Sequence, residues 1–168
     1  MNKFPRSAYV HIPFCHRRCF YCDFAVIPLG NKVETLQGYG SKTVKEYLHF
    51  LYKEILSIKH KSSLSTIYVG GGTPSILDPQ QIKQLIDLFK ENYGVDYGAE
   101  ITMEVDPASF NLDDLHGFIN AGINRFSLGV QSFNNQILQK SGRRHLREDA
   151  EKSCLWLKKV YSAGLIKS

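Results

Sequence analysis

The sequence predicts an α/β fold in which parallel β/α units form part of an open, TIM-type barrel. Four short runs rich in β-branched and aromatic residues alternate with four helical patterns. This order favours parallel strands joined by right-handed crossovers. In addition, the runs alternate polar with apolar residues, whereas strands covered by helices on both faces are nearly continuously apolar. A polar strand face indicates a ligand-holding lumen, with ligands at the carboxyl ends of the strands.

The predicted strands cover residues 7–14, 65–71, 99–106 and 123–131. Successive side chains of a strand point to opposite faces, so residues two apart share a face. Tyr9 and His11 share one face, as do Tyr68 and Gly70. In the later runs an apolar set alternates with a polar one: Ile101, Met103, Val105, Phe126, Leu128 and Val130 against Thr102, Glu104, Asp106, Arg125, Ser127, Gly129 and Gln131.

The helical patterns have apolar stripes and end signals. Asp78 is the expected N-cap of the second helix, with Pro79 at its first position, Gln81 as capping-box partner and Gly94 after its end. Asn111 and Gly122 bracket the third. The expected stripes are Val44, Tyr47, Leu48, Leu51 and Ile55; Ile82, Leu85, Ile86 and Phe89; and, before Gly164, Leu146, Ala150, Cys154, Leu157 and Tyr161.

Size and composition predict one folded domain over residues 1–168. The chain is 43% hydrophobic and 12% aromatic, enough for a substantial core, and no linker divides it. The end "AGLIKS" looks like a helix C-cap followed by the start of a strand, so we expect a piece truncated before further β/α units and a C-terminal domain. The basic residues behind the net charge of +5 are scattered, so no nucleic-acid partner is expected. No signal-like or transmembrane segment is seen, which favours a cytoplasmic location.

Three of the four cysteines lie in "AYVHIPFCHRRCFYCDF" as CxxxCxxC: Cys15, Cys19 and Cys22. In a reducing compartment such cysteines are more often metal ligands than disulfides. A zinc site of three Cys and one His lacks the second, distant CxxC pair that is usual in structural zinc sites. Unligated thiols are usually buried, and these occupy a polar loop. The favoured interpretation is a 4Fe-4S cluster with three protein ligands, which leaves one iron open to a small molecule.

The cysteine motif, with an aromatic residue (Tyr21) before its last cysteine and placed after the first strand, resembles the radical S-adenosylmethionine (SAM) superfamily. The segments "YVGGGTPS", "EVDPASF" and "INRFSLGVQSFNNQILQKSGRRH" resemble more narrowly the coproporphyrinogen III dehydrogenase/HemW group. The resemblance implies that the methionine moiety of SAM chelates the open iron. One electron from the cluster then yields methionine and a 5'-deoxyadenosyl radical, while the protein orients the cofactor.

The resemblance also assigns roles to individual residues. Tyr9 and Tyr21 would contact the cofactor, and Gly71, Gly72 and Thr73 would form a turn whose backbone approaches the methionine amino group. Glu104 would bind ribose or the amino group, Gln131 would end the fourth strand, and Arg143 would bind a carboxylate. Each has a plainer interpretation: Glu104 as a solvated strand end, the glycines as an ordinary turn, and Arg143 with Arg144 as surface charge.

Two departures from the dehydrogenase pattern favour the HemW type, whose members are regarded as heme chaperones that pass heme to an acceptor protein. Dehydrogenases of the group usually have a fourth cysteine two positions after the third, where this sequence has Phe24, and a longer stretch before the first strand, where Met1 lies only fourteen residues before Cys15. The alternative is a radical enzyme that decarboxylates a porphyrinogen. A zinc-binding interaction module is the third hypothesis.

Arg17 and Arg18 lie between the first two cysteines of the motif. A basic loop beside a cluster would attract an acidic electron donor such as a flavodoxin. The plainer interpretation is a solvated basic loop, since arginine is usually exposed.

Overall fold

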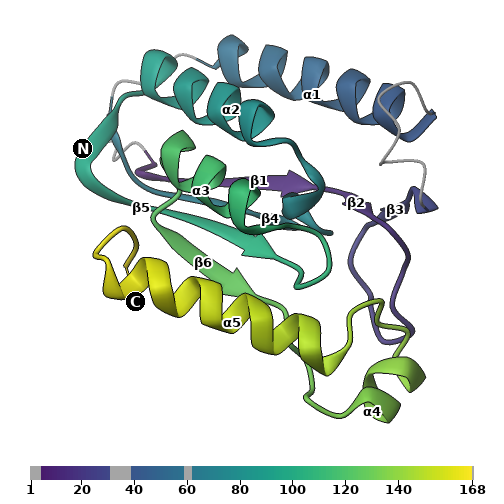
Figure 1. The fold of residues 1–168 in the computed structure, drawn as a ribbon. Helices are drawn as coiled ribbons and strands as arrows, with labels where there is room; N and C mark the ends of the chain where they lie inside the picture. Colours follow the sequence, from purple (N-terminus) through teal and green to yellow (C-terminus); the bar gives the residue numbers. More distant parts are fainter. Residues whose placement is uncertain (1–4, 31–38, 59–61, 168) are drawn as a thin grey trace.

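The centre of the molecule is a four-stranded parallel sheet. It is seen in a computed structural model that describes residues 5–30, 39–58 and 62–167. The strands lie in the order β1-β4-β5-β6, and each neighbouring pair is parallel (Figure 1). The predicted α/β fold of parallel β/α units is therefore confirmed. The strands are β1 (Ser7–Ile12), β4 (Leu64–Gly71), β5 (Val95–Val105) and β6 (Arg125–Leu128).

Helices alternate with these strands, and α1, α2 and α3 lie over one face of the sheet (Figure 1). α1 packs on α2, and α2 packs on α3. A short 3-10 turn, η2, follows β4. The bounds are α1 (Tyr39–Ser57), η2 (Pro74–Ile76), α2 (Pro79–Asn92), α3 (Leu112–Ala121), α4 (Asn135–Lys140) and α5 (Arg147–Ser162). No helix in the described part of the chain is long and apolar enough to span a membrane.

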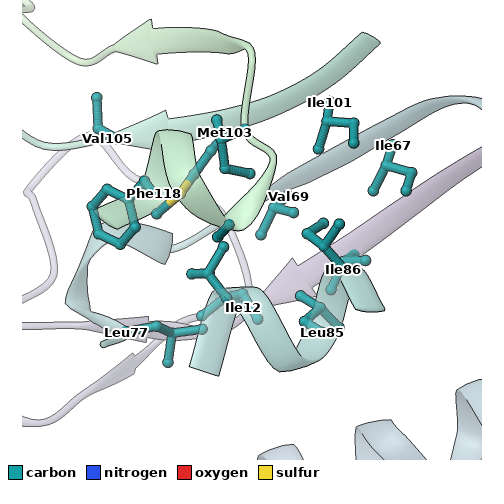
Figure 2. Close-up of a cluster of buried hydrophobic side chains, with 14 of the residues drawn as sticks. Ile12, Ile67, Val69, Leu77, Leu85, Ile86, Ile101, Met103, Val105 and Phe118 are labelled. Atoms are coloured by element: carbon teal, nitrogen blue, oxygen red, sulfur yellow. The ribbon is translucent and has the colours of Figure 1, made fainter. Parts of the chain in front are cut away.

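The core lies between the apolar strand face and the predicted helix stripes. Figure 2 shows Met103 and Val69 of the sheet with Leu85 and Ile86 of α2, all fully buried. The stripe of α1 is buried at Val44, Leu48 and Ile55 and half-buried at its other two positions. Burial of each such side chain stabilises the fold by about 1.5–3 kcal/mol, so these stripes fix the helices on this face.

The predicted helix ends are confirmed at α2 and α3. The Asp78 side chain accepts a hydrogen bond from the Gln80 amide and forms a capping box with Gln81. Asn111 caps α3 in the same way with Asp114, and Gly122 ends that helix with φ at 111°. That left-handed conformation favours glycine, because a Cβ atom would crowd the neighbouring carbonyl.

The other face of the sheet is polar, as the alternation predicts. The strand registers align Tyr9 with Tyr68, Tyr68 with Thr102, and Thr102 with Arg125 in one row across the sheet. Nearer the carboxyl ends, His11 pairs with Gly70 and Glu104 with Ser127. This second row leads directly to the loops that follow the strands.

All four observed strands differ from their predicted bounds, and two of the predicted runs are divided or cut short: β4 starts one residue earlier, and β5 starts four residues earlier and ends one residue earlier. The run 7–14 breaks at Pro13: β1 ends at Ile12, and β2 (Phe14–Cys15) pairs with β3 (Ile27–Pro28) in a separate two-stranded sheet. The run 123–131 gives a strand only to Leu128. The Val130 amide then donates to the Leu128 carbonyl and the Ser132 amide to the Val130 carbonyl, which turns the chain away. Gln131 therefore lies in a turn and does not end the strand.

The segment before α5 and the face of α5 also differ from expectation. α4, capped by Asn134, was not predicted; its one buried side chain is Leu138. The stripe predicted for α5 is wrong in part, because Leu146 precedes the helix with an extended backbone and is exposed. Tyr161 is exposed and Cys154 half-buried, whereas Ala150, Ser153 and Val160 are buried.

Candidate functional site

A pocket of about 320 Å³ lies where the carboxyl ends of β4, β5 and β6 meet the cysteine loop, residues 16–26 between β2 and β3. This is the end of the sheet at which ligands of parallel β/α folds bind. Every residue assigned to the site from the sequence lines this pocket except Tyr9: Cys15, Cys19, Tyr21, Cys22, Gly71, Gly72, Thr73, Glu104, Gln131 and Arg143.

Tyr9 lies in the next row of the polar face, outside the pocket lining. Its ring stacks on Tyr68 with centroids 5.9 Å apart, and its hydroxyl lies 3.3 Å from Nδ1 of His11. Burial, helped by the charge of Glu104, raises the pKa of Tyr9. Tyr9 therefore reaches the site through Tyr68, whose hydroxyl donates to Glu104.

The backbone amides of the turn at Gly71, Gly72 and Thr73 are all engaged within the protein and are not available to a ligand. Gly71 donates to Glu104 at 3.1 Å, Gly72 to the Ile12 carbonyl at 2.8 Å and Thr73 to the Phe14 carbonyl at 2.7 Å. Gly71 has φ at 116°. The backbone groups that this turn can still offer to a ligand are carbonyl oxygens, which accept hydrogen bonds from a donor such as an ammonium group.

Cys15 is held against this turn. A Cβ atom on Gly72 would lie 3.0 Å from Cys15 Sγ and 2.6 Å from the Phe14 carbonyl oxygen. The Thr73 hydroxyl donates to Cys15 Sγ at 3.4 Å. Burial raises the pKa of the Cys15 thiol; the bond from Thr73 opposes the shift, and the neighbouring thiols add to it.

The cysteine loop is organised by its own arginines and by a distant segment. Arg18 donates from Nε and Nη2 to the Cys22 carbonyl at 3.0 and 2.9 Å, and the Cys22 amide donates to the Cys19 carbonyl at 3.2 Å. Arg17 donates to the carbonyl of Arg143. The loop thus has a defined conformation set by main-chain and arginine contacts.

Three thiols line this pocket, which is the number of protein ligands expected for a 4Fe-4S cluster with one open iron. Cys15, Cys19 and Cys22 are half-buried, and none of them forms a disulfide. Among residues 5–30, 39–58 and 62–167, no three His, Cys, Asp or Glu side chains converge on a point suited to one metal ion. The cysteines of a 4Fe-4S cluster bind different iron atoms, so they do not need to converge in that way.

Glu104 projects from the end of β5 as an oriented acceptor. The Tyr68 hydroxyl donates to its Oε1 at 2.8 Å, and the Gly71 amide donates to its Oε2 at 3.1 Å. Burial and the bond to Glu104 raise the pKa of Tyr68, so that hydroxyl stays protonated. The remaining lone pairs of the carboxylate are available to a donor such as a hydroxyl or ammonium group.

Arg143 is nearly buried and crosses from the α4–α5 connection to the cysteine loop. Its guanidinium pairs with Asp106, donates to the Gly129 carbonyl at 2.9 Å and lies 3.7 Å from Cys19 Sγ through Nη1. Burial disfavours its charge, but Asp106, Tyr21 and Cys19 more than offset this and raise the pKa of Arg143. Since Asp106 already holds Nη2, the part of the fork left for a ligand is Nη1.

Tyr21 belongs to the cysteine loop, and its side chain lies beside that of Arg143. Burial raises the pKa of its phenol, Arg143 opposes the shift, and Cys19 adds to it. The ring lines the pocket and remains about half exposed, at 52%. Its position suits contact with a flat or apolar part of a ligand.

Two polar residues of the site were not singled out from the sequence. Asp106 follows β5 and lies on the face that the alternation predicts to be polar. The sequence therefore indicated the face on which this side chain lies, but not that it pairs with Arg143. His145 is fully buried, and its ring nitrogens contact Arg143 and the Val130 carbonyl. No pattern in "GRRH" marks that histidine as buried.

Comparisons with known proteins show the family to which the chain belongs. A family model described as the radical SAM superfamily matches residues 9–166. The chain belongs to the radical SAM superfamily. It is 41% identical over 150 residues to the heme chaperone HemW of Synechocystis, covering 89% of this chain and 35% of the relative. It is 38% identical over 148 residues to HemW of Bacillus subtilis, covering 86% of this chain and 36% of the relative.

The same chain also resembles the oxidases of the group. It is 40% identical over 139 residues to the oxygen-independent coproporphyrinogen III oxidase of Escherichia coli, covering 79% of this chain and 28% of that protein. The solved structure of the Escherichia coli coproporphyrinogen III oxidase HemN, described as a radical SAM enzyme, matches 92% of this chain and 34% of its own with a TM-score of 0.75 and 33% identity. The match confirms the predicted partial barrel. The chain spans about a third of the length of the relatives it matches.

Proposed function

We propose that this protein is a HemW-type heme chaperone that retains a 4Fe-4S cluster and a SAM site. The observation that carries this proposal is the similarity to HemW chaperones over nearly nine tenths of the chain, at 41% and 38% identity. The absence of a fourth cysteine at position 24, where Phe24 stands, favours the same assignment. Residues 1–168 would form the single radical SAM core domain of this protein.

Cys15, Cys19 and Cys22 would hold the cluster in the pocket, and the residues facing them would hold SAM. When bound, the cluster and SAM supply one-electron reductive cleavage of a carbon–sulfur bond. The carbonyls of the Gly71–Thr73 turn and the Glu104 carboxylate would accept hydrogen bonds from the amino group and the ribose. Nη1 of Arg143 would donate to the carboxylate, and Gln131 and Tyr21 would contact the remainder.

The chain's own contribution is orientation and exclusion of water. Glu104 is aimed by Tyr68 and Gly71, and Arg143 by Asp106, so neither side chain must be ordered when a ligand enters. Groups that are ordered beforehand lose less conformational entropy on binding. Phe24 and Val26 of the cysteine loop add apolar walls to the pocket.

Heme transfer is tested with the full-length protein, reconstituted with iron and sulfide under anaerobic conditions. Hemin is titrated and followed by its absorbance, and the loaded protein is mixed with apomyoglobin as an acceptor. We expect stoichiometric heme binding and transfer to the acceptor. A protein that binds no heme with its cluster intact would contradict the chaperone assignment.

The alternative is an oxygen-independent coproporphyrinogen III oxidase, favoured by the 40% identity to the Escherichia coli enzyme and the TM-score of 0.75 to the solved oxidase. The reduced, reconstituted protein is supplied with SAM and coproporphyrinogen III. Decarboxylated porphyrinogen accumulating over many turnovers would favour the oxidase and overturn our assignment. Formation of 5'-deoxyadenosine without porphyrin product is the result we expect.

We further propose an acidic electron donor, such as a flavodoxin, as a partner of the cysteine loop. Arg17 and Arg18 are exposed beside the cysteines. Both arginines also donate to main-chain carbonyls, which holds their charges at the surface of the loop. Positive charge at such a surface speeds association with an acidic partner.

A further inference from the structure

His145 is a fully buried histidine with no direct access to the pocket. It lies two residues after Arg143, and each ring nitrogen has a partner. Nδ1 lies 3.3 Å from Nε and 3.2 Å from Nη2 of Arg143, while Nε2 lies 2.9 Å from the Val130 carbonyl oxygen. A buried polar ring with both nitrogens engaged strongly constrains the groups that it contacts.

These partners determine the protonation of the ring. Arginine has only donors and a carbonyl only accepts, so Nδ1 must accept from Arg143 and Nε2 must donate to Val130. The ring is therefore neutral, with its hydrogen on Nε2. Burial lowers the pKa of His145, and the positive charge of Arg143 acts in the same direction while Asp106 opposes it.

The bond to Val130 supports a strained turn. Gln131 has φ at 61°, the only positive value among non-glycine residues of the described chain. The Ser132 amide donates to the Val130 carbonyl at 2.7 Å across Gln131, which makes Gln131 the centre of a γ-turn. This kind of turn is rare and strained, and such strain persists only where surrounding contacts hold it. The Val130 carbonyl that closes the turn is the one bound by His145.

The hydrogen bond from Arg143 to His145 holds the guanidinium close to the Gln131 turn. Gly129 marks the place where the two side chains approach each other. A Cβ atom on Gly129 would lie 3.5 Å from Nη2 of Arg143 and 3.5 Å from Nε2 of Gln131. One buried ring thus contacts the backbone that orients Gln131 and the guanidinium that reaches Cys19.

We propose that His145 is a positioning residue that fixes Gln131 and Arg143 together for SAM binding. The proposal rests on the proposed function, in which those two side chains contact SAM. In this proposal, Gln131 and Arg143 make the hydrogen bonds to SAM themselves, and His145 holds the two side chains in the positions from which they can do so. Loss of the ring would release the Gln131 turn and one side of the guanidinium at once.

Three substitutions test this in the full-length, cluster-loaded protein, with the Kd for SAM measured by equilibrium dialysis. His145→Leu removes both hydrogen bonds. His145→Asn keeps an acceptor near the Nδ1 position for Arg143, and His145→Gln keeps a donor near the Nε2 position for Val130. We expect the Kd to rise about tenfold in His145→Leu and about threefold in each of the other two, as expected for hydrogen bonds near a charged group.

Asn92→Ala is the matched control. The Asn92 amide also donates two hydrogen bonds to main-chain carbonyls, those of Ile55 and Ile58 at 2.6 and 2.8 Å, but where the end of α2 meets the end of α1. This variant should unfold at a lower temperature and bind SAM as the wild type does. Iron and sulfide content, determined for every variant, should be unchanged, which separates SAM positioning from cluster loss.

The outcomes distinguish the proposed SAM site from the positioning role of His145. A cluster-loaded His145→Leu that binds SAM with the wild-type Kd would overturn the positioning role. If His145→Leu is insoluble, an unchanged Kd in both His145→Asn and His145→Gln would overturn it equally. A cluster-loaded wild type that binds no SAM would overturn the proposed cofactor and the positioning role with it. The reduced cluster of the wild type should also change its electron paramagnetic resonance spectrum on SAM addition, at lower SAM concentrations than in His145→Leu.

Discussion

A Cβ atom at residue 72 would lie 2.6 Å from the Phe14 carbonyl oxygen and 3.0 Å from Cys15 Sγ. The first of these neighbours is backbone, which cannot move aside cheaply. Gly72→Ala should therefore lower the free energy of unfolding by about 1–3 kcal/mol, as overpacking does. It should also push Cys15 from its place and reduce cluster content. Urea unfolding and iron and sulfide analysis after reconstitution measure the two effects.

Gly98→Ala is the control that separates a loss of stability from a loss of cluster content. Gly98 has φ at 77° and no atom within 4 Å of the position of a Cβ, so alanine there adds backbone strain without a clash. We expect a destabilisation of about 1–2 kcal/mol from the left-handed backbone, with normal iron content. Equal loss of iron in both variants would show that cluster content reports general stability and not the contact with Cys15.

Glu104 is the acceptor that the structure aims most clearly into the pocket. Glu104→Gln should raise the Kd for SAM about 10- to 100-fold, because a charge-assisted hydrogen bond is lost. Tyr68→Phe, which removes one of the two groups that orient Glu104, should raise it about two- to tenfold. Equilibrium dialysis of the cluster-loaded protein measures both. Glu100→Gln, on the same strand and facing Arg125, is the control and should bind SAM normally.

At the scale of elements, the connection from α4 to α5 holds the cysteine loop. The Phe20 amide donates to the Ser141 carbonyl at 3.0 Å, and Arg17 donates to the Arg143 carbonyl. Gly142, with φ at 80°, leaves room for Phe20, since a Cβ atom there would lie 3.2 Å from its amide nitrogen and 3.3 Å from its ring. The connection between α4 and α5 thus sets the place of the loop that carries Cys19 and Cys22.

Gly142→Val should loosen this docking and expose the loop to protease. We expect trypsin to cleave after Arg17 or Arg18 faster than in the wild type, because cleavage follows the population of the open form. Gly164→Val is the control: Gly164 also has a positive φ, 70°, but nothing lies within 4 Å of the Cβ position. Cleavage of the loop at wild-type rate in Gly142→Val would contradict the docking role.

At the scale of the whole molecule, the net charge of +5 says less about partners than the position of two of the positive charges, Arg17 and Arg18, on the cysteine loop. Replacing Arg17 and Arg18 with glutamine keeps hydrogen-bond donors and removes two charges from the cysteine loop. The rate of cluster reduction by an acidic flavodoxin should fall with ionic strength in the wild type, and less steeply in this variant, because salt screens exposed charges. Stopped-flow absorbance follows the reduction.

The control for this prediction removes the same charge elsewhere. Lys158 and Lys159 are exposed near the end of α5 that lies away from the cysteine loop (Figure 1). Their replacement with glutamine should leave the salt dependence as in the wild type. A salt dependence that is equal in all three proteins would dispose of the basic loop as the docking surface.

Features that depend on contacts between near neighbours along the chain, with a clear residue pattern, were predicted from the sequence. Asp78 and Asn111 were predicted as caps because a cap bonds amides within three residues of itself. The polar placement of Glu104 followed from strand alternation, which is also local. In contrast, α4 and the turn at Gln131 were missed: a six-residue helix has little periodic signal, and a positive φ at glutamine runs against its intrinsic preference.

The sequence by itself determined the order of β/α units, the polar face of the sheet and the CxxxCxxC spacing, because periodicity and spacing are properties of neighbours along the chain. Only the tertiary structure decided that Arg143 pairs with Asp106, that His145 is buried against both Arg143 and Val130, and that Tyr9 lies outside the pocket. These contacts join separate elements, and their formation depends on how the strands and loops pack.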